Sequence, residues 1–151
     1  MTAADTAAPL RAHITVSDAA AAIAFYRAAF GAEELFRLTD PGAGKIGHAE
    51  LAIGASVLML NDPFAEMGVV GPDALGGTPV ALYLPAPDCD AALARAAEAG
   101  ATVDRPAADQ FFGERVAHLR DPFGHRWILA QQLEEVSPAE MQRRWSEMLG
   151  G

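Results

Sequence analysis

The octapeptide RDPFGHRW, residues 120–127, lies between two short runs in which apolar residues alternate with others. Pro122 presets φ near the value that the first central position of a turn needs, and Gly124 can adopt positive φ without strain. The octapeptide therefore predicts a tight turn that joins two antiparallel strands. In the register that this turn favours, His118 lies opposite Ile128.

Around this hairpin, one order of strands and helix occurs twice along the chain. Each half contains a strand, a helix, a short strand and a hairpin, and each helix follows a capping aspartate, Asp18 or Asp88. Each helix also ends at a glycine, Gly31 or Gly100. A repeat of this kind predicts an α+β fold of two βαβββ modules. We place the modules at residues 10–62 and 78–131, within a single domain of residues 10–132.

The expected elements follow from the spacing of the apolar residues and from the positions of glycine and proline. In the first half they are strands at 11–16, 35–39, 45–53 and 56–61, with a helix between Asp18 and Gly31. In the second half they are strands at 79–84 and 101–105, a helix between Asp88 and Gly100, and the hairpin at 114–130. Residues 62–78 are expected to form a connecting loop, and residues 1–9 a flexible tail.

A separate helix is expected at residues 137–150. Ser137 can cap it, Pro138 suits its first position, and Glu140 can reach back to the cap. Met141, Trp145 and Met148 share one face of this helix, so that face must pack on something. Packing on its own domain and packing on a partner subunit are both open; we expect a homodimer.

Composition narrows the classes of function. The chain has 151 residues, and its net charge of −9 with a single lysine argues against binding to nucleic acid or to an anionic membrane. No apolar run approaches the ~18 residues that a membrane span requires. One cysteine, Cys89, cannot form an intrachain disulfide and suits a reducing compartment, so we expect a cytoplasmic protein.

Alternation along the strands separates two faces in each sheet. One face is aliphatic or aromatic, with Leu51, Leu82 and Leu129 as examples, and should lie under the helices. The other face is mixed and carries Arg11, His13, His48, Glu50, Met59, Tyr83, His118 and Ile128. Such a face is either solvated or lines a cup.

Several motifs resemble those of one superfamily. They are DPFGHRW near the end of the chain, VSD running into AIAFYRAAFG, GHAELAIG, FGER and SPAEM. Together they resemble the vicinal oxygen chelate superfamily of glyoxalases, bleomycin-resistance proteins and extradiol dioxygenases, and most of all its PhnB-like branch. The resemblance implies a curved mixed sheet of two modules around a central cup, and it favours the cup over a solvated face.

The resemblance also bears on metals. Metal-using members carry one ligand on each of four strands, and the matching positions here are Arg11, Met59, Pro79 and Ile128. None is a usable ligand for a hard divalent ion. We therefore expect no metal and no cofactor. A relocated metal site built from His13, His48, Glu50 and His118 stays open as an alternative.

Candidate roles follow from side-chain chemistry. His118 matches a position where extradiol-cleaving relatives carry an active-site tyrosine, although cross-strand packing would equally explain it. We name His118, His13 and Glu50 as candidate catalytic residues, and as candidate ligand-binding residues Arg11, His48, Met59, Tyr83, Phe111 and Ile128. We expect His125 to face solvent.

Three functions fit these residues. The first is a metal-free protein that holds a small, partly apolar organic molecule in the cup. The second is a metal-independent acid/base enzyme, such as an isomerase, lyase or hydrolase, that uses His118, His13 or Glu50. The third is a metal-dependent lyase or dioxygenase with the relocated site. The sequence favours the first narrowly and leaves open whether the protein is an enzyme.

Overall fold

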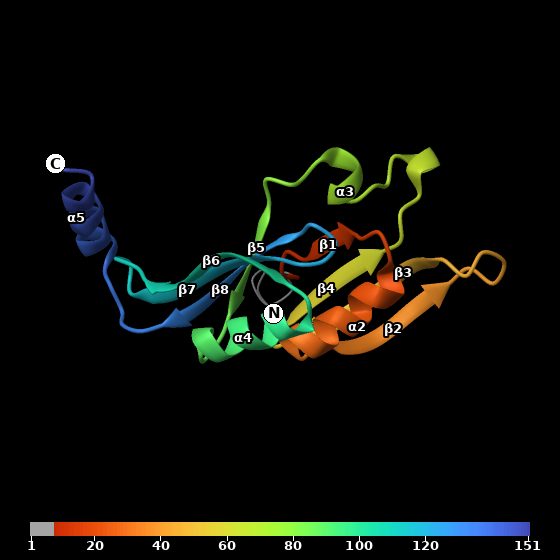
Figure 1. The fold of residues 1–151 in the computed structure, drawn as a ribbon, viewed down its shortest axis with the longest axis horizontal. Coiled ribbons are helices and arrows are strands. Elements are labelled where there is room, and N and C mark those ends of the chain that lie inside the picture. The colour runs from red at the N-terminus through yellow and green to blue at the C-terminus, as the bar shows by residue number, and fades with distance from the viewer. Residues whose placement is uncertain (1–7) are drawn as a thin grey trace, which may run out of the picture.

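The computed structural model describes residues 8–151, which form two four-stranded sheets (Figure 1). The first sheet has the order β1-β4-β3-β2, with β1 at Ala12–Thr15, β2 at Glu33–Thr39, β3 at Ile46–Ile53 and β4 at Ser56–Asn61. The second has the order β5-β8-β7-β6, with β5 at Ala81–Pro85, β6 at Thr102–Asp109, β7 at Glu114–Arg120 and β8 at Arg126–Gln132. In each sheet the first pair is parallel and the others are antiparallel. The α+β class and the two βαβββ modules are confirmed.

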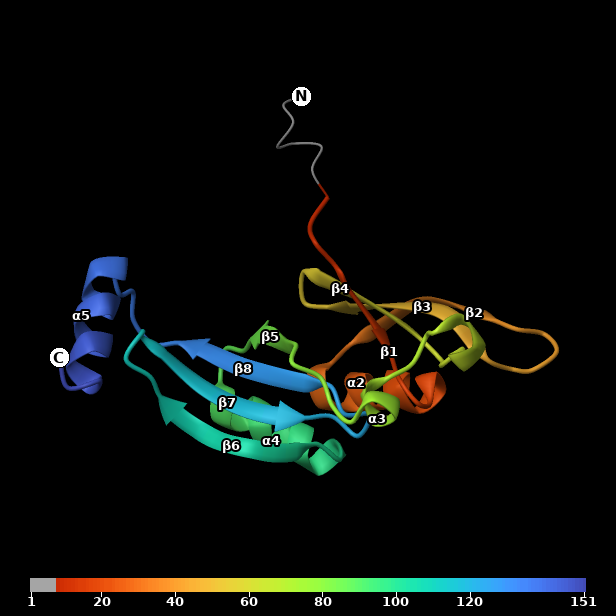
Figure 2. The same ribbon diagram turned by 90° about the horizontal axis from the view of Figure 1, so that it is seen from above.

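Each module carries one long helix, α2 at Ala19–Phe30 or α4 at Cys89–Ala99. The side chain of Asp18 accepts a hydrogen bond from Ala21 N, and Asp88 accepts one from Ala91 N, as their positions in the sequence predict. The two helices lie on the same side of the molecule (Figures 1 and 2). The opposite face of each sheet has no long helix over it, and we call it the open face.

The connection between the modules is more ordered than predicted. The expected loop at 62–78 contains a 3₁₀ turn, η1 at Ala65–Met67, and a short helix, α3 at Pro72–Leu75. Proline at the first turn of α3 and a left-handed glycine after it, Gly76, suit a single helical turn. Strand β6 also runs beyond the predicted end at Arg105, through Pro106, because an edge strand tolerates proline. The first residues of the expected tail, 1–7, lie outside the described part of the chain.

The register of both hairpins agrees with the sequence. Glu50 pairs with Met59 across β3 and β4, and His118 pairs with Ile128 across β7 and β8. Leu51 and Leu129 are fully buried under the helices, while Leu82 is partly buried against the same core. The predicted division into an aliphatic face and a mixed face is therefore correct.

Asp121 connects the two modules. In its own turn, its Oδ1 accepts hydrogen bonds from the backbone N–H groups of Phe123 and His125 at 2.9 and 3.0 Å. Its Oδ2 accepts from the hydroxyl of Tyr26 on α2 at 2.5 Å and from Trp127 Nε1 at 2.9 Å. Burial, then the nearby charge of Asp121, raises the pKa of Tyr26 well above its ordinary value, so this tyrosine remains a neutral donor. The buried carboxylate thus accepts two hydrogen bonds at each of its oxygens.

A second contact crosses between the modules beside Asp121. The Nε2 atom of His125 lies 2.8 Å from the carbonyl oxygen of Thr15 in β1 and is half-buried. The expectation that His125 faces solvent is wrong, because the turn of the second module packs against the first. On the helix side, Arg95 of α4 donates to the carbonyl of Ala28 near the end of α2 at 2.7 Å.

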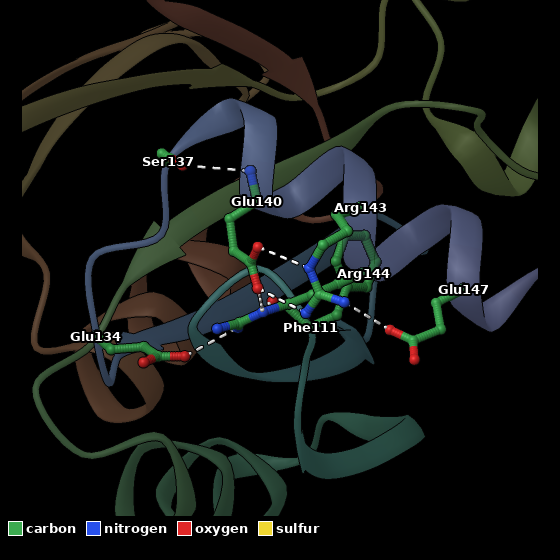
Figure 3. Close-up of polar contacts among 7 residues, drawn as sticks. All are labelled: Phe111, Glu134, Ser137, Glu140, Arg143, Arg144 and Glu147. Carbon is green, nitrogen blue, oxygen red and sulfur yellow. Dashed lines mark hydrogen bonds and ion pairs between the residues drawn. The ribbon is translucent and has the colours of Figure 1, made fainter.

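The last helix, α5 at Pro138–Met148, stands apart from the sheets at one end of the molecule (Figures 1 and 2). Arg144 attaches it by donating to the carbonyl of Phe111 at 2.8 Å and to Glu134 at 3.0 Å (Figure 3). Its Ser137 cap is confirmed. Trp145 and Met148 are 49% and 66% exposed, so most of the apolar face is uncovered in a single chain. No helix among residues 8–151 is long and apolar enough to cross a membrane.

Candidate functional site

Polar side chains gather on the open face of the first sheet around Glu50, and we call this set the Glu50 cluster. Strand register places His13 beside Met59 and Glu50 beside Met59, while Phe36 lies beside Glu50 on the other side. Side chains that pair in this way project from the same face of a sheet. The cluster comprises Arg11, His13, Phe36, His48, Glu50 and Met59.

The Glu50 carboxylate is the centre of this cluster. Its Oε2 lies 2.8 Å from Nε2 of His48, and its Oε1 lies 3.7 Å from an Arg11 nitrogen. The rings of His13 and His48 meet edge to face at 5.5 Å, and Phe36 lies 5.8 Å from the His48 ring. The Glu50 side chain is only 18% exposed although no long helix covers it. A ligand that reaches this carboxylate must therefore compete with His48 and Arg11.

A second cluster lies on the open face of the second sheet around His118, and we call it the His118 cluster. It comprises Arg105, His118, Arg120, Arg126 and Asp104. Burial lowers the pKa of His118 from its ordinary value, and the charges of Arg105 and Arg126 lower it further, against an opposing effect of Asp104. His118 is therefore mostly a neutral imidazole at pH 7, able to accept or donate a hydrogen bond.

The two sheets meet along a seam between their edge strands β1 and β5, and two clefts lie on it. The first, of about 310 Å³, is lined by Arg11 from one module and Tyr83 from the other. The second, of about 390 Å³, is lined by His13 and His125. The remaining predicted site residues of the two sheets, His48, Glu50, Met59, His118 and Ile128, line neither cleft. A single chain therefore divides the predicted site between two open faces.

Two of the predicted ligand-binding aromatics have other neighbours. The hydroxyl of Tyr83 donates to Glu114, and its ring, 52% exposed, lies beside Ile128. Phe111 packs edge to face on Phe112 at 5.2 Å and lines a cleft with Trp145 of α5. Phe111 thus belongs to the attachment of α5 rather than to the Glu50 cluster.

The residues at the positions of the superfamily's metal ligands do not fit a metal. Arg11 and Pro79 precede β1 and β5, so the strand neighbours of Met59 and Ile128 are His13 and Tyr83 instead. With either pair, the set offers at most one imidazole and no carboxylate. In the described part of the chain, no three His, Cys, Asp or Glu side chains converge as a metal site requires. The donor sets at these positions therefore give no support to a reaction step that runs through a metal.

Sequence reasoning missed five members of these clusters: Phe36, Asp104, Arg105, Arg120 and Arg126. Arg126 shares the alternation of Ile128, which would have placed it on the open face. The position of Phe36 beside Glu50 follows from the pairing of β2 with β3. The short strand predicted at 35–39 gave no register for that pairing. Arg105 faces His118 only because a bulge interrupts β6 between Val103 and Arg105, and the neighbouring Pro106 is the one available signal of that irregularity.

Comparison with known proteins agrees with this geometry. Residues 8–129 match the family described as Glyoxalase/Bleomycin resistance protein/Dioxygenase superfamily. The uncharacterized protein Mb0911c of Mycobacterium bovis is 44% identical over 145 residues, which cover 94% of this chain and 95% of that protein. The uncharacterized protein Rv0887c of Mycobacterium tuberculosis is likewise 44% identical, over 94% of this chain and 85% of that protein.

Solved structures share the fold. TioX from Micromonospora sp. ML1 has a TM-score of 0.65 at 26% identity, and the match covers 84% of this chain and 100% of TioX. A gene product of Arabidopsis thaliana, At5g48480, has a TM-score of 0.67 at 26% identity, covering 83% of this chain and 100% of that one. The repeated βαβββ plan, the open mixed faces and the match over most of the chain lead to one conclusion: this chain belongs to the Glyoxalase/Bleomycin resistance protein/Dioxygenase superfamily.

Proposed function

We propose that this protein, a member of the PhnB-like branch, binds a small, partly apolar organic molecule without a metal. The observation that carries the proposal is the Glu50 cluster, a partly buried set of polar groups beside the apolar side chains of Phe36 and Met59. Small-molecule sites combine a few fixed polar groups with an apolar wall in this way. The side chains at the metal positions are poor ligands for a metal, and this supports a site in which side chains contact the organic ligand directly.

A homodimer would complete such a site. Each open face presents half of the predicted residues, with Glu50 and His48 on one sheet and His118 and Ile128 on the other. A second copy that lays its second sheet against the first sheet of its partner would bring these halves around one ligand. The uncovered apolar face of α5 supports association with another copy, because exposed patches of that kind are typical of interfaces.

Purified protein should contain no stoichiometric divalent metal. Elemental analysis is expected to find well under one equivalent of zinc, nickel or iron, and a chelator should leave the melting temperature unchanged, because His48 and Arg11 already engage Glu50. Unbiased mass spectrometry of the same sample should detect the co-purifying organic ligand. Near-stoichiometric metal that is lost in a His48→Ala variant would instead establish the relocated metal site.

The variant His118→Ala separates a binding protein from an enzyme. For a binding protein we expect a loss of about 1–3 kcal/mol in ligand affinity, the usual penalty for an unmatched buried polar group, with the ligand recovered chemically unchanged from the wild type. A neutral imidazole at pH 7 also suits a general base, and this favours the acid/base enzyme as the second candidate. In that case turnover would fall roughly 10²–10⁴-fold with little change in affinity.

Calorimetry and single-turnover assays on the same ligand measure the two quantities. Arg27→Ala is the control, because Arg27 is an exposed residue on α2, away from the open faces. Unchanged affinity and unchanged turnover in His118→Ala would remove His118 from the site, and His13 and Glu50 would be tested next.

A further inference from the structure

Two arginines in the His118 cluster are free of the ion pairs that occupy most other basic side chains. Within residues 8–151, neither Arg105 nor Arg126 has a side-chain hydrogen bond or an ion pair. Most of the other basic residues are engaged with carboxylates or backbone carbonyls: Arg11, Arg37, Lys45, Arg95, Arg115, Arg120, Arg143 and Arg144. The chain has 20 acidic residues against 11 basic ones, so two arginines on one face of a sheet without a carboxylate call for an explanation.

Strand geometry places both arginines around His118. Arg105 lies directly opposite His118 across β6 and β7, where the bulge directs it. Arg126 lies two residues before Ile128, the other cross-strand neighbour of His118, and therefore projects from the same open face. The charges of both arginines act on His118. Arg105 and Arg126 therefore project from the same face of the sheet as His118, one from each of the strands that flank β7.

Nearby charges do not cancel this pair. Asp104 is the acidic group that acts on His118, and it is already held by Arg120 at 3.0 Å. Glu114 lies farther along β7 and accepts from Tyr83. The two guanidinium groups therefore keep their hydrogen-bond donors available, and a neutral imidazole beside them can add another.

We propose that Arg105, Arg126 and His118 bind an anionic group, a carboxylate or a phosphate, on the ligand. A guanidinium matches the planar oxygens of either group with two donors, and two guanidiniums can hold one anion from two sides. This inference deepens the proposed function and rests on it, because it assigns the chemistry of one end of the ligand. The Glu50 cluster, on the other sheet, then contacts a different part of that molecule.

The probe for this site is inorganic phosphate, and the readout is the ring signals of the 4 histidines in NMR. Phosphate should raise the pKa of His118 by about one unit relative to sodium chloride at the same ionic strength, because an anion offsets the two arginines. The signal of His125, which belongs to neither cluster and bonds to the Thr15 carbonyl, serves as the internal reference and should respond equally to the two salts. A parallel titration with acetate distinguishes the sources: a response to acetate assigns a carboxylate, and a response to phosphate alone assigns a phosphate.

Variants assign the effect to the two arginines. Arg105→Gln and Arg126→Gln should each raise the pKa of His118 without phosphate and weaken the phosphate response several-fold. Arg27→Gln is the matched control, since Arg27 is an exposed residue on α2 and the variant loses the same charge. Asp104→Asn should strengthen the response, because it removes the competing carboxylate and releases Arg120.

The site is disproved if phosphate shifts His118 no more than chloride does, or if Arg27→Gln weakens the response as much as Arg105→Gln. Neither result depends on the co-purifying ligand, so a failure of the anion site is distinguishable from a failure of the proposed function. Conversely, a phosphate response without any co-purifying ligand would support the anion site while leaving the proposed function without support.

Discussion

Asp121→Ala should lower the free energy of unfolding by about 4 kcal/mol, because it leaves several buried donors without an acceptor. The carboxylate accepts from Tyr26, from Trp127 and from two turn amides, and the two side-chain donors come from different modules. A domain of this size is stable by only about 5–15 kcal/mol, so the loss should lower the melting temperature by roughly 10 °C. Urea unfolding followed by fluorescence measures the change.

Two comparisons make this prediction specific to the buried carboxylate. Asp109→Ala removes an exposed aspartate that is paired with Arg115 and should cost less than about 1 kcal/mol. Tyr26→Phe removes one donor and should cost about 1–2 kcal/mol, and its effect should not add to that of Asp121→Ala, because the two groups bond to each other. Equal losses in Asp121→Ala and Asp109→Ala would show that the carboxylate does not connect the modules.

Removal of residues 137–151 should convert a homodimer into a monomer. In the single chain Met148 and Leu149 are 66% and 70% exposed, whereas Met141 faces the cleft beside Phe111. One end of the apolar face therefore packs on its own domain, and the other end is exposed in the single chain. Light scattering on the full chain and on the truncated chain measures the change in mass.

A point variant tests the same surface without deletion. Trp145→Glu should weaken the dimer by roughly 30- to 1,000-fold, which corresponds to about 2–4 kcal/mol for the loss of an aromatic anchor. Arg143→Gln changes the net charge by the same amount at an exposed position of α5 outside the cleft that Trp145 lines, and should have little effect. A full chain that is monomeric, or a truncated chain that is still dimeric, would contradict this role of α5.

Most of the fold could be predicted because it depends on local rules. Capping aspartates fixed the starts of both long helices, and turn chemistry set Glu50 opposite Met59 and His118 opposite Ile128. These features depend on a few neighbouring residues, so the sequence carries them directly.

The less predictable features depend on contacts between distant residues. His125 turns toward Thr15 only because the two modules pack together, and their sequence separation of 110 residues hides that contact. Arg105 reaches His118 through a bulge, and the short helix α3 forms in a segment whose glycines and prolines predict a loop. The candidate site was predicted residue by residue, but its division between two sheets follows from how the modules are placed.

The Asp121 contact also shows how far the two halves of the repeat have diverged. Tyr26 lies eight residues after the capping Asp18, and the residue at the same distance after Asp88 is Ala96, which is fully buried. The first hairpin turns at Gly54 and has no carboxylate where the second has Asp121. Each half thus supplies a different partner of a single contact. Replacing either module with a copy of the other would therefore lose the bond that joins them.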